Sequence, residues 1–71
     1  MIKEAALNVS GVKNINTVRA HFVGSFIHVE IHIEVDKLLP TLDSHAIGKQ
    51  VERGVESLKA IEKAFVHIDP V

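Results

Sequence analysis

Hydrophobic and polar residues alternate most strictly between residues 26 and 36 of this chain. Every odd position from Ile27 to Val35 is Ile or Val, and every even position from His28 to Asp36 is His, Glu or Asp. An alternation of this length is typical of a strand with one buried face and one polar face. The pattern therefore predicts a strand over residues 26–36, in a sheet covered on one side.

Weaker alternation predicts two further strands. Apolar and polar positions alternate over residues 12–23, and the Gly24-Ser25 pair that follows predicts a hairpin turn into the strand described above. Residues 63–69 alternate in the same way. We expect Pro70 to end this last strand, because proline cannot donate a ladder hydrogen bond.

Two helices are predicted between and before these strands. Residues 2–9 include good helix formers, and Gly11 supplies a stop just beyond them. A second helix is predicted to begin after a proline, where Thr41 or Asp43 can cap it, and to run to about residue 58. Its apolar positions recur at spacings of four, four and three residues and form one stripe: Ile47, Val51, Val55 and Leu58.

The predicted order is helix, strand, strand, helix, strand. The antiparallel hairpin needs the second helix as a right-handed crossover, which makes the last strand parallel to one strand of the hairpin. We therefore expect an α+β fold, a two-layer sandwich in which both helices cover one face of a three-stranded mixed sheet. The 71 residues allow one domain, residues 1–71.

Composition and charge exclude several classes of protein. The hydrophobic content of 46% is too high for a disordered chain, and a formal charge of -1 without a basic stripe argues against a nucleic-acid partner. No apolar run is long enough for direct insertion of this segment into a membrane, and no signal peptide follows the first Met. The absence of Cys excludes disulfides and thiolate metal sites, and an intracellular location fits.

Histidine is unusually frequent, with five residues in 71. His32 lies on the polar face of the second strand, while His67 and Asp69 are two residues apart and leave the same face of the last strand. His45 lies in the first turn of the second helix. Imidazole nitrogens with a carboxylate suit zinc and similar divalent ions, so these four residues are candidate ligands.

A solvated polar surface is the competing interpretation. A His-x-Asp pair occurs by chance in many strands, and the acidic residues of the second strand fit an edge that discourages aggregation. His21 and His28 are interpreted as surface residues for the same reason.

Three stretches, in this order and spacing, resemble the cytosolic C-terminal domain of the cation diffusion facilitator (cation efflux) family. They cover nearly the whole chain: Val18-Arg19-Ala20-His21 with Gly24; residues 28–35 with Leu38-Leu39, Ser44-His45-Ala46-Ile47 and Val51-Glu52; and Val66-His67-Ile68-Asp69-Pro70.

The resemblance implies a metallochaperone-like fold, a ferredoxin-like variant, that forms a two-fold dimer and binds zinc near the dimer interface. The positions that match the family's ligands are His32, His45, His67 and Asp69. Asn16 stands where zinc-binding members often have another His, and an amide oxygen is a poor zinc ligand beside imidazole. We therefore expect one ion held by His45, His67 and Asp69, with His32 at a weaker position.

The resulting hypothesis is a non-enzymatic, metal-sensing and dimerising domain of a divalent cation efflux transporter, with Zn²⁺ as the expected ion. Its partners would be a second copy and the transmembrane domain of the same transporter, at the cytoplasmic face of a membrane. A structural dimerisation domain without metal and a free metallochaperone-like module stay open as alternatives. A small hydrolase is a poor fit, because 71 residues leave little room for a substrate pocket.

Overall fold

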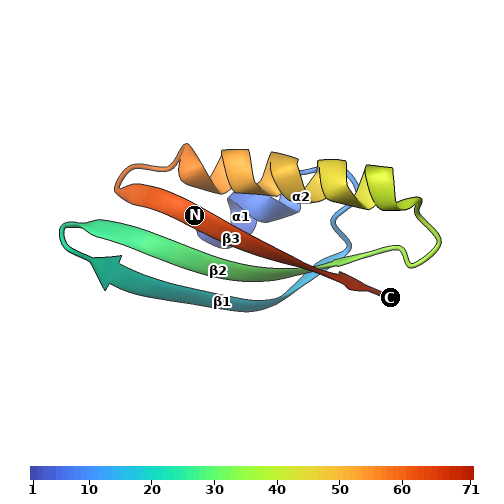
Figure 1. Ribbon diagram of the computed structural model, residues 1–71, viewed down its shortest axis with the longest axis horizontal. Coiled ribbons are helices and arrows are strands. Elements are labelled where there is room, and N and C mark those ends of the chain that lie inside the picture. The colour runs from blue at the N-terminus through green and yellow to red at the C-terminus, as the bar shows by residue number, and fades with distance from the viewer.

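The computed structural model describes residues 1–71 and has the predicted order of elements. Both helices lie on the same side of the sheet (Figure 1). The elements are α1 (Ile2–Leu7), β1 (Asn14–Val23), β2 (Phe26–Val35), α2 (Thr41–Glu56) and β3 (Ile61–Pro70).

The central strand is β2, which pairs antiparallel with β1 and parallel with β3. This topology confirms the predicted three-stranded mixed sheet. The apolar face of β2 packs against α2, and α1 contributes Ala6 to the same core. The fully buried side chains, at most 1% exposed, come from four elements: Ala6, Val29, Ile31, Ile33, Val35, Val51, Val55 and Ala64.

The first helix is shorter than predicted, because it ends at Leu7 with Asn8 as its C-cap. Gly11 lies in the turn that follows, with φ +99°, and is not the helix stop. The position has a second constraint, since a Cβ on Gly11 would meet Ile47 of α2.

The predicted caps of the second helix are wrong. The N-cap of α2 is Pro40, whose carbonyl oxygen accepts hydrogen bonds from the backbone N–H groups of Asp43 and Ser44. Thr41 is already helical, so neither Thr41 nor Asp43 is placed to cap, and no side chain caps this end.

The strand boundaries also differ from the predictions. β1 begins at Asn14, and β3 begins two residues early, at Ile61. Pro70 continues β3 opposite Val35 instead of ending it, which is tolerated because β3 is an edge strand. The hairpin of β1 and β2 extends beyond the helices (Figure 1), and Phe22 near its tip is 81% exposed.

Each edge strand contains one irregularity in its register with β2. The extra residue is Asn16 in β1 and Glu62 in β3. An extra residue bends the strand locally and can redirect a side chain from one face of a sheet to the other. The two irregularities lie toward opposite ends of the sheet, and both extra residues contact groups on its uncovered face.

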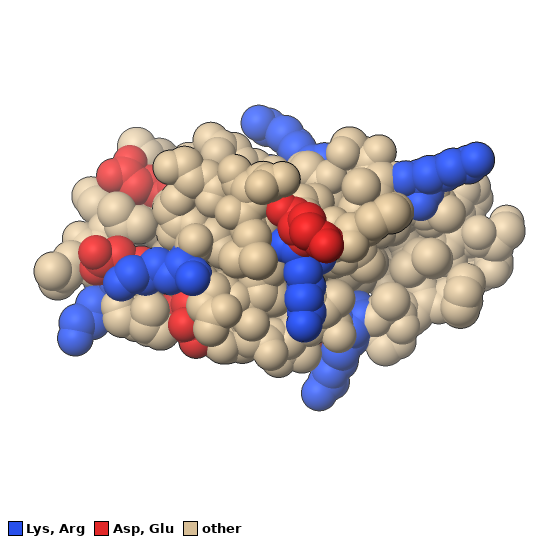
Figure 2. All heavy atoms as spheres, turned by 180° about the vertical axis from the view of Figure 1, so that it is seen from behind, with Lys and Arg blue, Asp and Glu red and all other residues tan.

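The surface carries charges of both signs. Figure 2 shows basic and acidic side chains mixed on one side of the molecule, without a continuous basic patch. Neither helix is both long and apolar enough to span a lipid bilayer.

Candidate metal centre

The uncovered face of the sheet carries a group of ionisable side chains from its central and last strands. Glu30 and His32 belong to β2, and His67 and Asp69 belong to β3. Residues two apart on a strand share a face, and the register places His32 directly beside His67. Pairing of the two strands therefore gathers groups that are 35 residues apart in the sequence.

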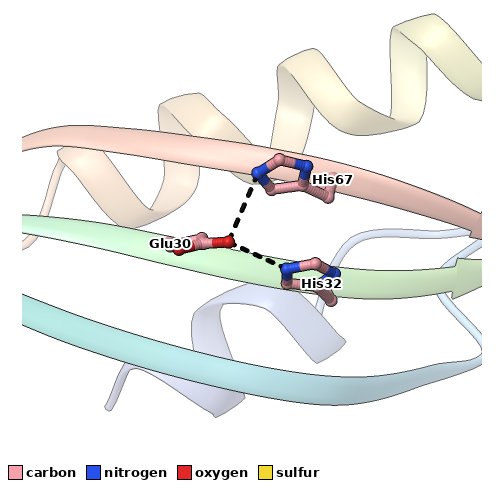
Figure 3. A group of neighbouring side chains, drawn as sticks. All are labelled: Glu30, His32 and His67. Atoms are coloured by element: carbon pink, nitrogen blue, oxygen red, sulfur yellow. Dashed lines mark hydrogen bonds and ion pairs between the residues drawn. The ribbon is translucent and has the colours of Figure 1, made fainter.

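The carboxylate of Glu30 lies beside the two imidazole rings and contacts both (Figure 3). Its Oε2 atom is 3.0 Å from Nε2 of His32 and 3.5 Å from Nε2 of His67. The rings are stacked, with centroids 4.5 Å apart and planes 10° apart. One ligand atom from each of the three residues lies within 4.8 Å of the others.

The carboxylate of Glu30 is held in its charged form. The hydrogen bond with His32 lowers the pKa of Glu30 below its usual value of 4.5, and the nearby His67, His32 and Arg19 lower it further. Burial acts in the opposite direction and is outweighed. Glu30 is therefore available as an anionic ligand at neutral pH.

Asp69 lies at the border of this group. Its Oδ2 atom is 3.7 Å from Nδ1 of His32 and accepts a hydrogen bond of 3.3 Å from the side-chain amide of Asn16. Asn16, the extra residue in β1, thus reaches across the face of β2 to Asp69 on β3. Asn16 presents its N–H group to Asp69, so it orients a carboxylate here.

His45 lies apart from the group. It is exposed near the start of α2 and lines two hollows beside the edge strand, one with Ser44 and Pro70 and the other with Gly48 and Lys49. The structure therefore brings together His32, His67 and Asp69, and it leaves His45 in the helical layer.

Glu30 was missed by the sequence analysis, which interpreted it as part of a solvated edge. Glu30 is two residues before His32, so both side chains lie on one face of the strand, and this spacing could have identified Glu30 as a candidate ligand. The approach of His67 to Glu30 depends on the register between β2 and β3. Spacing along a single strand cannot predict that register.

The donor set fits a divalent metal ion. Ligand distances of about 2.0–2.2 Å around a tetrahedral ion place neighbouring ligand atoms roughly 3.3–3.6 Å apart. The separations of 3.0 and 3.5 Å around Glu30 are close to this range. Two imidazoles and a carboxylate are borderline ligands suited to zinc and its neighbours. His67 is 54% exposed, so the solvent side offers room for a further ligand.

Sequence comparison finds relatives among metal transporters. A family model described as "Cation efflux protein, cytoplasmic domain" matches residues 1–71. An uncharacterized transporter of Methanocaldococcus jannaschii is 41% identical over all of this chain, which spans 25% of that protein. The manganese efflux system protein MneS of Bacillus subtilis is 32% identical over 97% of this chain, which spans 24% of MneS.

Solved structures share the fold. A cadmium form of a MamM CTD variant has a TM-score of 0.92 and 32% identity, over 99% of this chain and 89% of that one. Another MamM CTD structure has a TM-score of 0.92 and 31% identity, over 99% and 90% of the two chains.

Proposed function

Because this chain belongs to the family of cytoplasmic domains of cation efflux proteins, we propose that it senses a divalent cation and dimerises to regulate an efflux transporter. The family is one of transport proteins, in agreement with a non-enzymatic role. The chain spans about a quarter of the two relatives described above. The remaining length would hold the partner transmembrane domain.

One observation carries the proposal, namely the convergence of Glu30, His32 and His67 on the face of the sheet that no helix covers. Three protein ligands leave room for a fourth on a tetrahedral ion. A second copy packed against this face would supply it, in a two-fold arrangement that uses the same surface twice. An ion that prefers the paired state then shifts the equilibrium toward it.

Zinc is the ion proposed for this site. A given set of nitrogen and oxygen ligands generally binds Zn²⁺ more tightly than Mn²⁺, so the site should bind zinc more tightly than manganese. The relative MneS is named for manganese. Tight zinc binding here would be compatible with transport of another ion if the rest of the protein selects the transported ion.

Calorimetric titration of zinc into the metal-stripped chain at pH 7.5 tests the proposal. The Glu30→Gln and His67→Ala variants should each weaken binding by about tenfold or more, because each loses a ligand. His45→Ala should change the affinity little, and Glu52→Gln on α2 is a matched control for Glu30→Gln. Sedimentation with and without zinc should show a shift toward dimer.

A structural dimerisation domain without metal is the second candidate. It is favoured by the hydrogen bond from Asn16 to Asp69, which satisfies the carboxylate without an ion. A chain that is dimeric after metal stripping and shows no heat of zinc binding would support this role and refute metal sensing. Unchanged zinc affinity in both Glu30→Gln and His67→Ala would place the ion elsewhere.

A further inference from the structure

A second group of potential ligands lies on the uncovered sheet face, toward the hairpin. It consists of His21 on β1, His28 on β2 and Glu62 on β3. His21 and His28 are direct cross-strand partners. The Nε2 atom of His28 is 2.7 Å from Oε1 of Glu62. One residue from each strand therefore contributes to the group.

Glu62 reaches this face because of the irregularity in β3. In a regular strand Glu62 would share the face of Ala64, which is buried in the core. The register instead shifts between the pairs of Ile27 and His28, and Glu62 is the extra residue. Its carboxylate is thereby turned to His28 on the opposite face. Such redirection of a side chain is a known consequence of bulges.

A hollow of about 440 Å³ runs along the face between this group and the first centre, with His21, His28 and Phe65 in its lining together with Glu30 and His67. The Phe65 ring is 6.0 Å from the ring of His28. The side chains of His28 and Glu62 are 28% and 51% exposed, so an ion has access to both.

We propose that His21, His28 and Glu62 bind a second divalent cation of the borderline class, separate from the Glu30–His32–His67 centre. Two imidazoles and one carboxylate form a ligand set for such ions that leaves further positions to water. Ligands at about 2.0–2.2 Å from a tetrahedral ion lie roughly 3.3–3.6 Å from each other. Insertion of an ion between His28 and Glu62 thus requires a small widening of their 2.7 Å contact.

His21 completes the site by rotation of its side chain. Directly opposed residues of an antiparallel pair have Cβ atoms about 4.5–5.5 Å apart, within reach of one ion for two imidazoles. His21 is exposed, so its ring is free to turn toward His28. Two positive charges belong to the same face: Lys63 is the register partner of His28, with its Nζ atom 5.9 Å over the Phe65 ring, and Arg19 is two residues before His21 on β1.

The test uses the chain with His32→Gln and His67→Gln, which removes the first centre and leaves the second intact. Calorimetry with zinc at pH 7.5 should still show one ion per chain. Addition of either Glu62→Gln or His21→Gln should weaken this binding by about tenfold or more. Glu52→Gln, added to the same double variant, is the matched control and should leave the affinity unchanged. In NMR spectra, zinc should shift the imidazole nitrogens of His21 and His28.

Absence of zinc binding in the folded double variant would overturn the proposal. Binding that survives both Glu62→Gln and His21→Gln would overturn it as well, because the ion would then lie elsewhere. Circular dichroism of each variant establishes that it is folded. Failure of the first centre is detected separately in the single variants Glu30→Gln and His67→Ala, so the two proposals stand or fall independently.

Discussion

Replacement of Gly11 by alanine is expected to destabilise the domain strongly for its size. Gly11 joins α1 to β1 with φ +99°, a conformation that residues with a Cβ rarely adopt. An added Cβ would lie 2.5 Å from Cδ1 of Ile47 and 3.1 Å from its Cγ1. The substitution thus combines backbone strain with a collision between the α1–β1 connection and α2.

The two effects have known sizes. Left-handed backbone costs a residue with a Cβ about 1–2 kcal/mol, and overpacking costs about 1–3 kcal/mol. The lower entropy of the unfolded alanine chain offsets about 0.4–1 kcal/mol. We expect a net loss of about 2–3 kcal/mol in the free energy of unfolding, against a total of about 4–11 kcal/mol for 71 residues. The melting temperature should fall by about 10–20 °C.

Urea and thermal unfolding of the metal-stripped chain, followed by circular dichroism, measure this loss. Gly24→Ala is the matched control, because Gly24 has φ +64° and nothing within 4 Å of an added Cβ. It should lose about 1 kcal/mol from backbone strain alone. Ile47→Val removes the colliding Cδ1 atom, so Gly11→Ala should cost at least about 0.5 kcal/mol less in that background. Equal losses for the two glycine substitutions, without coupling to Ile47, would refute the collision.

Three further changes have outcomes that follow from single features of the fold. Ile31→Ala, at a fully buried position of β2, should lower the free energy of unfolding by about 2–5 kcal/mol in urea denaturation. Ala60→Gly should raise the melting temperature, with a gain of up to about 1 kcal/mol, because Ala60 has φ 72°. The lowered pKa of Glu30 means that its hydrogen bond with His32 stabilises the fold above pH 4.5 and is lost as the pH falls through the pKa in the folded state. In the metal-stripped chain, Glu30→Gln should therefore reduce the loss in the free energy of unfolding as the pH falls below 4.5. An unchanged pH dependence would contradict this assignment.

Local patterns predicted the fold well where each element buries one face. The alternation over residues 26–36 identified β2, because its odd positions from Ile27 to Val35 belong to the core or pack against it. The end of β3 could not be predicted in the same way. Pro70 is acceptable as a ladder residue on an edge strand, and the edge position is a property of the whole sheet.

The candidate site was predictable only in part, for a related reason. A period of two assigns His32, His67 and Asp69 to polar faces, and all three share the uncovered side. The alternation cannot predict the register of β3 against β2, because that register depends on the crossover helix and on the extra residue in β3. Glu30 was therefore overlooked. His45 was grouped with the others from its place at the start of a helix, although that helix lies in the other layer.

The charge on the uncovered face explains how an ion would control pairing in the proposed function. Glu30 and Asp69 place two carboxylates beside the stacked imidazoles of each copy. Two facing copies would oppose four carboxylates, and each close pair of like charges costs about 1 kcal/mol in water and about 4 kcal/mol near a protein surface. A divalent cation per copy offsets these charges and adds coordination bonds. The β2–β3 ladder already holds the ligands in place, so the ion can favour the paired state without refolding either copy.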